Sequence, residues 1–572
     1  MTNHVHVKHI AIFLICSFFL ISGCSSNEKK KENFLSEGKA YFENQAYKKA
    51  IIQFKNVIKI DPESNEAYKM LAQSYFKSGQ AKEAFSSYLR LEQLDPENLE
   101  IKIKLATFYL IGKKNQEAES RVDQVLSKEP KNIEALYLYA GILSARNEEF
   151  DTIKQVYDKI LKIDPEQTMA HMVLAKIFVS QEDFSRAEES LNSALKLNPD
   201  DINIHKTLAE FYMSQKDVDA ARKVLENLVK AKPNDSKALI MLGNFYLSQK
   251  NNSLAEKTFL KAIEKNPDNI AAYMAIAKYY NSIKKETKAE QYILKALKID
   301  PEHAGLKNSY ANFQYTHQNF EKAETLVNEI LDIRPGYIPS KTLKGKILIQ
   351  KKEYDRAIKI FQELVQEDPK SQGYNFFLGS ALFQKGNPEA AMPFLSETLS
   401  INPNNFPARL LMANIYYGKK DFFLAEAEVK KILKVLPEHY NANILLGNIE
   451  AAQKNYGPAE NLFKKMILAA PEKPSAYYRL GLLQRMQKDN KAAMTNFEKA
   501  LKLNPNLMDV FSNVISMYNS QELFDKALER CDRQMTLVAD IPAVHSILFN
   551  LKGKILLGLN KIDQGKPSLK NP

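Results

Sequence analysis

The chain contains few of the residues that indicate chemistry or covalent stabilisation. Its 572 residues include no Trp and only three cysteines, Cys16, Cys24 and Cys531. Three scattered cysteines exclude a disulfide scaffold and a multi-cysteine metal site. The sequence also lacks a Gly-rich phosphate loop, a Cys-x-x-Cys pair and a Gly-x-Ser-x-Gly elbow. These absences argue against nucleotide-binding, redox and hydrolytic enzymes, so we predict a non-enzyme with no catalytic residue, no cofactor and no bound metal.

Glycine and proline are scarce, at 19 and 23 residues, whereas 45% of the chain is hydrophobic and 26% is charged. This composition is typical of a folded chain and not of a disordered one. The formal net charge is +12. The lysines are spread along the sequence and form only one dense cluster, Lys29–Lys31. We therefore interpret the basicity as a solvated surface, and we do not predict nucleic acid as a partner.

The N-terminus contains a single apolar run, from Ile10 to Ile21, and Lys8 is the only charged residue before Cys24. A bilayer core of about 30 Å requires about 20 apolar residues, so this run is too short to span it. Its length is typical of an export signal. The sequence Leu20-Ile21-Ser22-Gly23-Cys24 that follows resembles the bacterial lipobox, and the alternative is an ordinary signal with an accidental cysteine.

The lipobox resemblance implies that residues 1–23 are a lipoprotein signal peptide and that Cys24 is the lipid attachment site. Residues 24–30 would then be a polar lipidated tether. In such lipoproteins a residue other than Asp after the cysteine, here Ser25, implies sorting to the outer membrane, facing the periplasm. Because one acyl chain anchors a protein only marginally, the multiple acylation implied by the resemblance would make the attachment durable.

Three residue series recur at a spacing of 34 residues, with one interval of 35 among the prolines. The prolines stand at positions 62, 96, 130, 165, 199, 233, 267, 301, 335, 369, 403, 437, 471 and 505. An alanine series runs from Ala50 to Ala527, interrupted at Ile153. A series of Gly or Ala runs from Gly38 to Gly481. Three series in one register indicate an array of structural repeats.

Each repeat has apolar residues at steps of three and four on both sides of a polar turn, which predicts two amphipathic helices. The small residue and the alanine would let the two helices approach closely, and the Asp-Pro or Asn-Pro would end the second helix. The pattern resembles the tetratricopeptide repeat. In the seventh repeat its signature is Gly243, Tyr246, Ala255, Phe259 and Pro267. The Trp that is common in the family is absent.

The resemblance implies an all-α fold, a right-handed superhelix of about 15 helix-turn-helix repeats over residues 31–541, with first helices on the concave side. We expect the repeats to stack into one continuous core. Residues 542–572 would form a terminal half-repeat or cap. The extra residue of the fourth repeat should lie in the turn between Ala140 and Phe150. Pro393, inside the second helix of the eleventh repeat, should bend that helix.

The first-helix residues that follow the small position, with neighbouring aromatic residues, form a candidate partner-binding groove. Asn offers a donor and an acceptor to an extended backbone, Lys offers charge, and aromatic residues offer pockets. The alternative is that these polar residues only solvate the surface. The candidate residues are Asn244, Lys278, Asn312, Lys346, Phe376, Phe383, Asn414, Tyr417 and Asn448.

Two further features have simple structural explanations. His171 and His205 occupy equivalent positions in neighbouring repeats, which is too far apart for a shared metal ion. Cys531 takes the aromatic position of the fifteenth repeat, and we expect a small buried hydrophobic side chain there.

The repeats and the lipobox together predict a membrane-anchored scaffold of the bacterial envelope that binds proteins or extended peptides in its concave groove. Residues 46–62, AYKKAIIQFKNVIKIDP, resemble tetratricopeptide lipoproteins of PEP-CTERM/exosortase systems, which implies a role in exopolysaccharide production or protein sorting. The alternatives are a secretion or pilus assembly lipoprotein and a periplasmic peptide-binding or sensing module.

Overall fold

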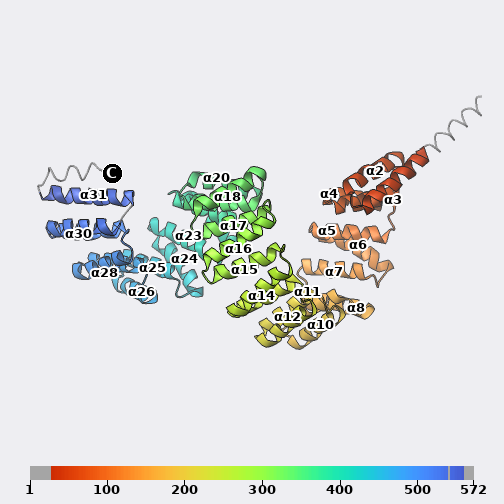
Figure 1. Cartoon of the computed structure of the whole chain (residues 1–572), viewed down its shortest axis with the longest axis horizontal. Coiled ribbons are helices and arrows are strands. Elements are labelled where there is room, and N and C mark those ends of the chain that lie inside the picture. Colours follow the sequence, from red (N-terminus) through yellow and green to blue (C-terminus); the bar gives the residue numbers. More distant parts are fainter. Residues whose placement is uncertain (1–26, 539–540, 560–572) are drawn as a thin grey trace, which may run out of the picture. The chain divides into compact units, whose positions relative to one another are not determined.

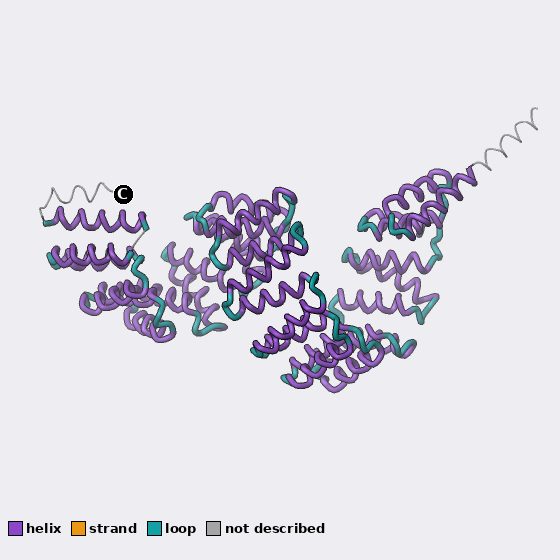
Figure 2. Tube along the Cα trace, in the orientation of Figure 1, coloured by secondary structure: helices purple, strands orange, loops and turns teal. Residues whose placement is uncertain are grey.

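The computed structural model describes residues 27–538 and 541–559, and within them the chain consists of helices and turns without a strand (Figures 1 and 2). The predicted signal peptide and Cys24 lie outside the described residues. The described part has no helix that is both long and apolar enough to cross a lipid bilayer.

The helices alternate between two classes. The first helices of the repeats are the helix over residues 27–43, α3 (Asn65–Lys77), α5 (Leu99–Ile111), α7 (Ile133–Ala145), α9 (Thr168–Ser180), α11 (Ile202–Ser214), α13 (Ser236–Ser248), α15 (Ile270–Ser282), α17 (Ala304–Thr316), α19 (Ile338–Gln350), α21 (Gln372–Gln384), α23 (Phe406–Gly418), α25 (Tyr440–Ala452), α27 (Pro474–Met486) and α29 (Met508–Ser520). The second helices are α2 (Tyr47–Ile60), α4 (Ala81–Leu94), α6 (Asn115–Lys128), α8 (Phe150–Ile163), α10 (Phe184–Leu197), α12 (Val218–Ala231), α14 (Asn252–Lys265), α16 (Glu286–Ile299), α18 (Phe320–Ile333), α20 (Tyr354–Glu367), α22 (Pro388–Ile401), α24 (Phe422–Val435), α26 (Tyr456–Ala469), α28 (Asn490–Leu503) and α30 (Phe524–Leu537). A last helix, α31 (Pro542–Gly558), follows them.

The turn inside each repeat contains one residue with a positive φ. Thirteen of these residues are not glycine and have φ between 56° and 68°, and the other two are Gly79 and Gly386. The left-handed conformation ends the first helix and lets the chain reverse. In the fourth repeat this residue is Asn147, between α7 and α8. The turn there is one residue longer than in its neighbours, which confirms the predicted place of the insertion.

The repeating prolines lie in the connection between repeats. Asp95 follows the last residue of α4, and its N–H donates to Leu91 O at 2.8 Å. Two residues after Pro96, the Asn98 side chain accepts from Ile101 N and caps α5. Pro96 thus precedes the capping residue of the next helix and lies outside both helices. The prolines therefore separate the repeats, and Ser, Asn, Asp or His residues begin many of the next helices.

The two helices of a repeat meet at the small position. A Cβ added at Gly345 would lie 2.6 Å from the Phe361 ring, and one added at Gly243 would lie 2.5 Å from the Phe259 ring. Glycine also faces phenylalanine in three other repeats, whereas alanine mostly faces the smaller Val, Leu or Ile. In the fifteenth repeat the sizes are exchanged, because Ile515 and Cys531 occupy the two positions. A larger side chain at one position is thus matched by a smaller one at the other, as close packing requires.

The alanine series lies in the core. All of its members are 0% exposed, and Ile153, which replaces alanine in the fourth repeat, is 6% exposed. The members are Ala50, Ala84, Ala118, Ala187, Ala221, Ala255, Ala289, Ala323, Ala357, Ala391, Ala425, Ala459, Ala493 and Ala527. The predicted close approach of the helices is confirmed at these positions.

Tyrosines of the first helices connect neighbouring repeats. The Tyr212 hydroxyl donates to Glu188 at 2.6 Å, and the Tyr246 hydroxyl donates to Glu226 at 2.9 Å. Burial, followed by the hydrogen bond to the carboxylate, raises the pKa of both tyrosines to about 12. The signature tyrosine therefore bonds the first helix to the second helix of the preceding repeat.

One expectation from the sequence is corrected. Residues 27–30, predicted as part of a tether, are helical and continue into the helix over 27–43. Lys31 pairs with Glu28 at 2.6 Å and with Asp61 at 3.3 Å, which fixes this helix to the end of α2. The chain divides into two compact units after Ala296, within α16. Because each repeat contacts mainly its neighbours, a repeat array can divide at a single position.

The helix α22 continues across Pro393 and has the same 14 residues as the other second helices. Pro393 is exposed, so water can bind the carbonyl group that lost its helical donor. Asn387 caps this helix by accepting from Ala390 N at 3.2 Å. The helix is therefore not broken, and the bend at Pro393 stays a prediction.

Candidate functional site: the inner face of the first helices

First helices of neighbouring repeats lie against one another. In the N-terminal unit, up to Ala296, α5 contacts α7 and α13 contacts α15. In the C-terminal unit, from Leu297, contacts join α17, α19, α21, α23, α25 and α27 in succession. We call the surface of these helices that faces away from the second helices the inner face. The sequence places all the predicted groove residues on first helices.

In the N-terminal unit, Asn244 and Lys278 are exposed, on α13 and α15. Asn244 lines a pocket of about 490 Å³, which we call the central pocket. Its walls come from α11, α13 and α15, with Leu225 contributed by α12. The apolar lining residues are Ala209, Met213, Leu225, Ile240, Met241, Phe245 and Ala271. This pocket has the size and apolar lining of a site that accepts a side chain of a ligand.

In the C-terminal unit, Lys346 is half-buried on α19 and lies between aromatic rings. Its Nζ is 4.9 Å from the ring centre of Tyr315 and 5.6 Å from that of Phe377. Burial lowers the pKa of Lys346. The two rings stabilise the ammonium group by cation–π contacts in place of a carboxylate. Lys346 is thus a partly desolvated cation on a first helix.

The other predicted groove residues of the C-terminal unit have mixed environments. Asn312 is exposed, whereas Asn414 and Asn448 are half-buried. The Asn414 amide donates to Leu410 O at 2.7 Å, so its own helix uses one of its donors. The predicted aromatic residues Phe376, Phe383 and Tyr417 are half-buried and pack against core clusters. Their rings therefore contribute to the core as well as to the surface.

Sequence reasoning missed a second pocket, of about 450 Å³, near the N-terminus. It is lined by four aromatic residues and by polar residues of successive first helices. The aromatic residues are Phe42, Phe76, Tyr88 and Phe108. Phe76 is 57% exposed. The signal was present in the sequence, because Phe42 and Phe76 occupy the same repeat position as Phe383 and Tyr417.

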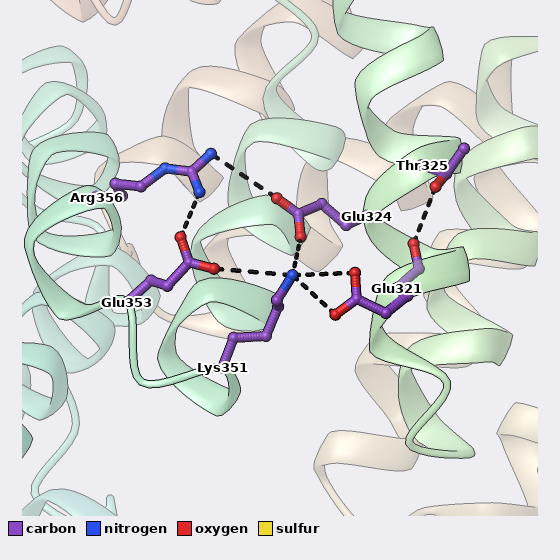
Figure 3. A network of polar contacts seen from close by, with 6 residues as sticks. All are labelled: Glu321, Glu324, Thr325, Lys351, Glu353 and Arg356. Atoms are coloured by element: carbon purple, nitrogen blue, oxygen red, sulfur yellow. Dashed lines mark hydrogen bonds and ion pairs between the residues drawn. The ribbon is translucent and has the colours of Figure 1, made fainter.

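Ion pairs at the turns connect repeats in the C-terminal unit (Figure 3). Lys351, after α19, pairs with Glu324 at 2.7 Å and with Glu321 at 3.0 Å, both on α18. Hydrogen bonds to these two glutamates raise the pKa of Lys351. Arg356 pairs with Glu353 and extends the network to α20. These charges join the ninth and tenth repeats to each other at the turns.

The two histidines and the cysteine have local structural roles. His171 Nε2 donates to Pro165 O at 3.0 Å, and His205 Nε2 donates to Pro199 O at 2.8 Å. Each ring thus closes the connection before its own helix. Cys531 is 0% exposed, and burial raises the pKa of its thiol to about 12. The expected buried hydrophobic role of Cys531 is confirmed.

Comparison with protein families identifies the repeats. The C-terminal domain of cilia and flagella-associated protein 70 matches residues 35–275. Tetratricopeptide-repeat families match residues 270–303, 348–415, 382–435 and 474–507. The chain is a tetratricopeptide-repeat solenoid. None of the matching families is a family of enzymes, and the architecture is that of a protein-binding scaffold.

Two solved structures are similar to this solenoid at low identity. Yeast Tom70 is 16% identical, with a TM-score of 0.40, and the match covers 69% of this chain and 96% of that chain. The Cut9–Hcn1 hetero-tetramer of APC/C contains a chain that is 14% identical, with a TM-score of 0.40 and coverage of 85% and 96%. No curated protein sequence is significantly similar to this chain. The fold assignment therefore rests on the matched repeats and the helix pairs.

Proposed function

We propose that this solenoid is a lipid-anchored scaffold of a bacterial envelope that binds protein partners on the inner face of its first helices. The observation that carries the proposal is the central pocket, where an apolar surface from three successive repeats stays open to solvent. A lipidated Cys24 would hold the first repeat close to the membrane, because the helix over 27–43 begins within three residues of it. Restricting the scaffold to a membrane would raise the effective concentration of weakly bound neighbours.

The pathway that we propose is exopolysaccharide production or exosortase-dependent protein sorting, on the resemblance of residues 46–62 alone. A secretion or pilus assembly lipoprotein and a periplasmic peptide-binding module remain as alternatives. The inner face and its pockets fit all three roles, because the roles differ only in which partner is bound.

Membrane attachment is tested in a bacterial host that makes lipoproteins. We expect Cys24→Ser to abolish incorporation of labelled palmitate and to move the protein from the membrane fraction to the soluble fraction. Cys16→Ser is the matched control, because it removes a thiol from the apolar run and should leave attachment unchanged. A Cys24→Ser protein that still carries label would contradict the proposal.

Partner binding is tested separately by crosslinking in cells followed by mass spectrometry. Ile240→Glu places a charge on the wall of the central pocket and should remove specific partners. Lys223→Glu changes an exposed charge on α12, away from the pocket, and should retain them. Identical partner sets for both variants would show that the pocket is not the binding surface.

A further inference from the structure

The few charges on the first helices of the fifth to eighth repeats are almost all positive. The helices α9, α11, α13 and α15 each carry one lysine, and Glu210 is their single acidic residue. The lysines are Lys176, Lys206, Lys237 and Lys278, and all four are exposed. The second helices of these repeats carry both signs, such as Arg186 with Glu188 on α10. The first helices thus differ from the second helices in carrying almost no acidic residue.

Two of these lysines stand at the central pocket. Lys206 on α11 and Lys237 on α13 both line it, next to the apolar walls formed by Met213, Ile240 and Met241. Lys206 makes one ion pair, a 3.6 Å contact with Glu210 on the same exposed helix surface. Lys237 makes no ion pair with any described residue. An apolar cavity between two available cations offers a complementary surface to an apolar side chain flanked by carboxylates.

We propose that the central pocket binds an extended acidic peptide segment of a partner protein. An aliphatic side chain enters between α11, α13 and α15, and carboxylates on either side pair with Lys206 and Lys237. This inference deepens the proposed function, since it rests on the inner face being the binding surface. The ligand needs no free C-terminus, because Lys206 and Lys237 are two separate cations that can each pair with a side-chain carboxylate.

The general spacing of packed helices suggests the spacing of the acidic residues. Neighbouring packed helices lie about 8–10 Å apart. An extended or polyproline II segment advances about 3.1–3.4 Å per residue. Carboxylates three positions apart therefore match lysines on successive first helices. A polyproline II segment also returns the same face every third residue, so the carboxylates share one face and the aliphatic side chains share an adjacent face.

The lining favours a peptide over a nucleic acid. Single-stranded nucleic acids bind on exposed aromatic faces along a basic groove. The central pocket has one aromatic residue, Phe245, which is 8% exposed, and its remaining apolar walls are aliphatic or thioether groups. Glu210 also lines the pocket, and a peptide can offer it a backbone N–H.

The test measures binding of a fluorescent probe to the full-length protein purified in detergent. The probe is an N-acetylated, C-amidated peptide, Gly-Glu-Pro-Leu-Glu-Pro-Leu-Glu-Gly, which has glutamate at every third position and cannot form a helix. We expect saturable binding that weakens with added salt, as an interaction between exposed charges should. Replacing the glutamates by lysine, or the leucines by serine, should abolish it.

Variants assign the binding to the pocket. The double variant Lys206→Glu with Lys237→Glu should raise the dissociation constant of the peptide about tenfold or more. It replaces two attractions between lysine and a peptide carboxylate by two repulsions between carboxylates. Lys223→Glu makes the same charge change on α12 and should leave the constant unchanged. Circular dichroism would verify that the variants keep their helices.

Three outcomes would overturn the inference: no saturable binding of the probe, equal loss with Lys223→Glu, or tighter binding of an oligothymidylate than of the peptide. The last outcome would identify a general polyanion surface. None of them would alter the result of the Cys24→Ser or Ile240→Glu experiments, so failure of the peptide inference is distinguishable from failure of the proposed function.

Discussion

The contact between Gly345 and Phe361 allows a quantitative test of how the helices of a repeat pack. The Cβ of Gly345→Ala would lie 2.6 Å from two atoms of the Phe361 ring, well inside the normal carbon–carbon contact. Phe361 is 0% exposed and lies in a core cluster, so the ring has little room to move. Overpacking of this kind costs about 1–3 kcal/mol. Replacing a helical glycine by alanine recovers about 0.5–1 kcal/mol, which leaves a net loss of roughly 0–2.5 kcal/mol.

A second substitution should relieve the clash. Phe361→Leu alone opens a void and should cost about 1–2 kcal/mol. Combined with Gly345→Ala it reproduces the pairing of Ala175 with Leu191 in the fifth repeat, where both residues are buried. The two changes should therefore cost less together than the sum of the single variants, with a coupling of about 1 kcal/mol or more.

Hydrogen exchange followed by mass spectrometry is the suitable assay, because unfolding of a repeat array is local and a single free energy does not describe it. Gly345→Ala should speed amide exchange in α19 and α20 by up to about 70-fold. Gly373→Ala is the control, because a Cβ there has open space. If Gly345→Ala slows exchange as Gly373→Ala should, the packing argument is refuted.

Three further predictions concern other parts of the chain. Cys531, with a thiol pKa near 12 and no exposed surface, should not react with a disulfide reagent at pH 8 until urea unfolds its repeat. The pKa values of Tyr212, Tyr246 and Tyr279 are raised to about 12 from 10, so their contribution to stability is complete below pH 10 and lost between pH 10 and 12. Thermal melts at pH 9 and pH 11.5 should show this loss, and equal melting temperatures would contradict it. Lys284→Gly removes the cost of a left-handed lysine at φ 58° and should stabilise its repeat by about 0.5–1 kcal/mol in exchange measurements, whereas faster exchange would show that the turn is not strained.

The helices and their register could be read from the sequence. The regular step of small residues, alanines and prolines specifies where each helix starts and ends, because an amphipathic helix needs its apolar face at fixed intervals. Even the extra residue of the fourth repeat falls in the predicted turn. The pairing of Gly345 with Phe361 and of Ile515 with Cys531 was also present in the sequence, since it is a local complementarity within one repeat.

The left-handed turn residues were not readable, because most of them are lysine, glutamine or glutamate where glycine would be the usual signal. The helix over 27–43 was also missed in part, because Glu28 and Lys29–Lys31 are equally compatible with a solvated tether. In the folded chain Lys31 contacts Asp61, which lies 30 residues away. A contact between distant residues has no signature in the local pattern.

The sequence by itself determined the all-α repeat architecture, because each repeat encodes its own pair of helices and its own close contact. Only the tertiary structure decided which residues share a surface. Met213, Ile240 and Ala271 line one pocket, and Lys206 and Lys237 stand beside it, because successive first helices pack against each other. Residues about 30 positions apart become neighbours only when the helices stack, and for that reason the binding surface emerges from the fold and not from any single repeat.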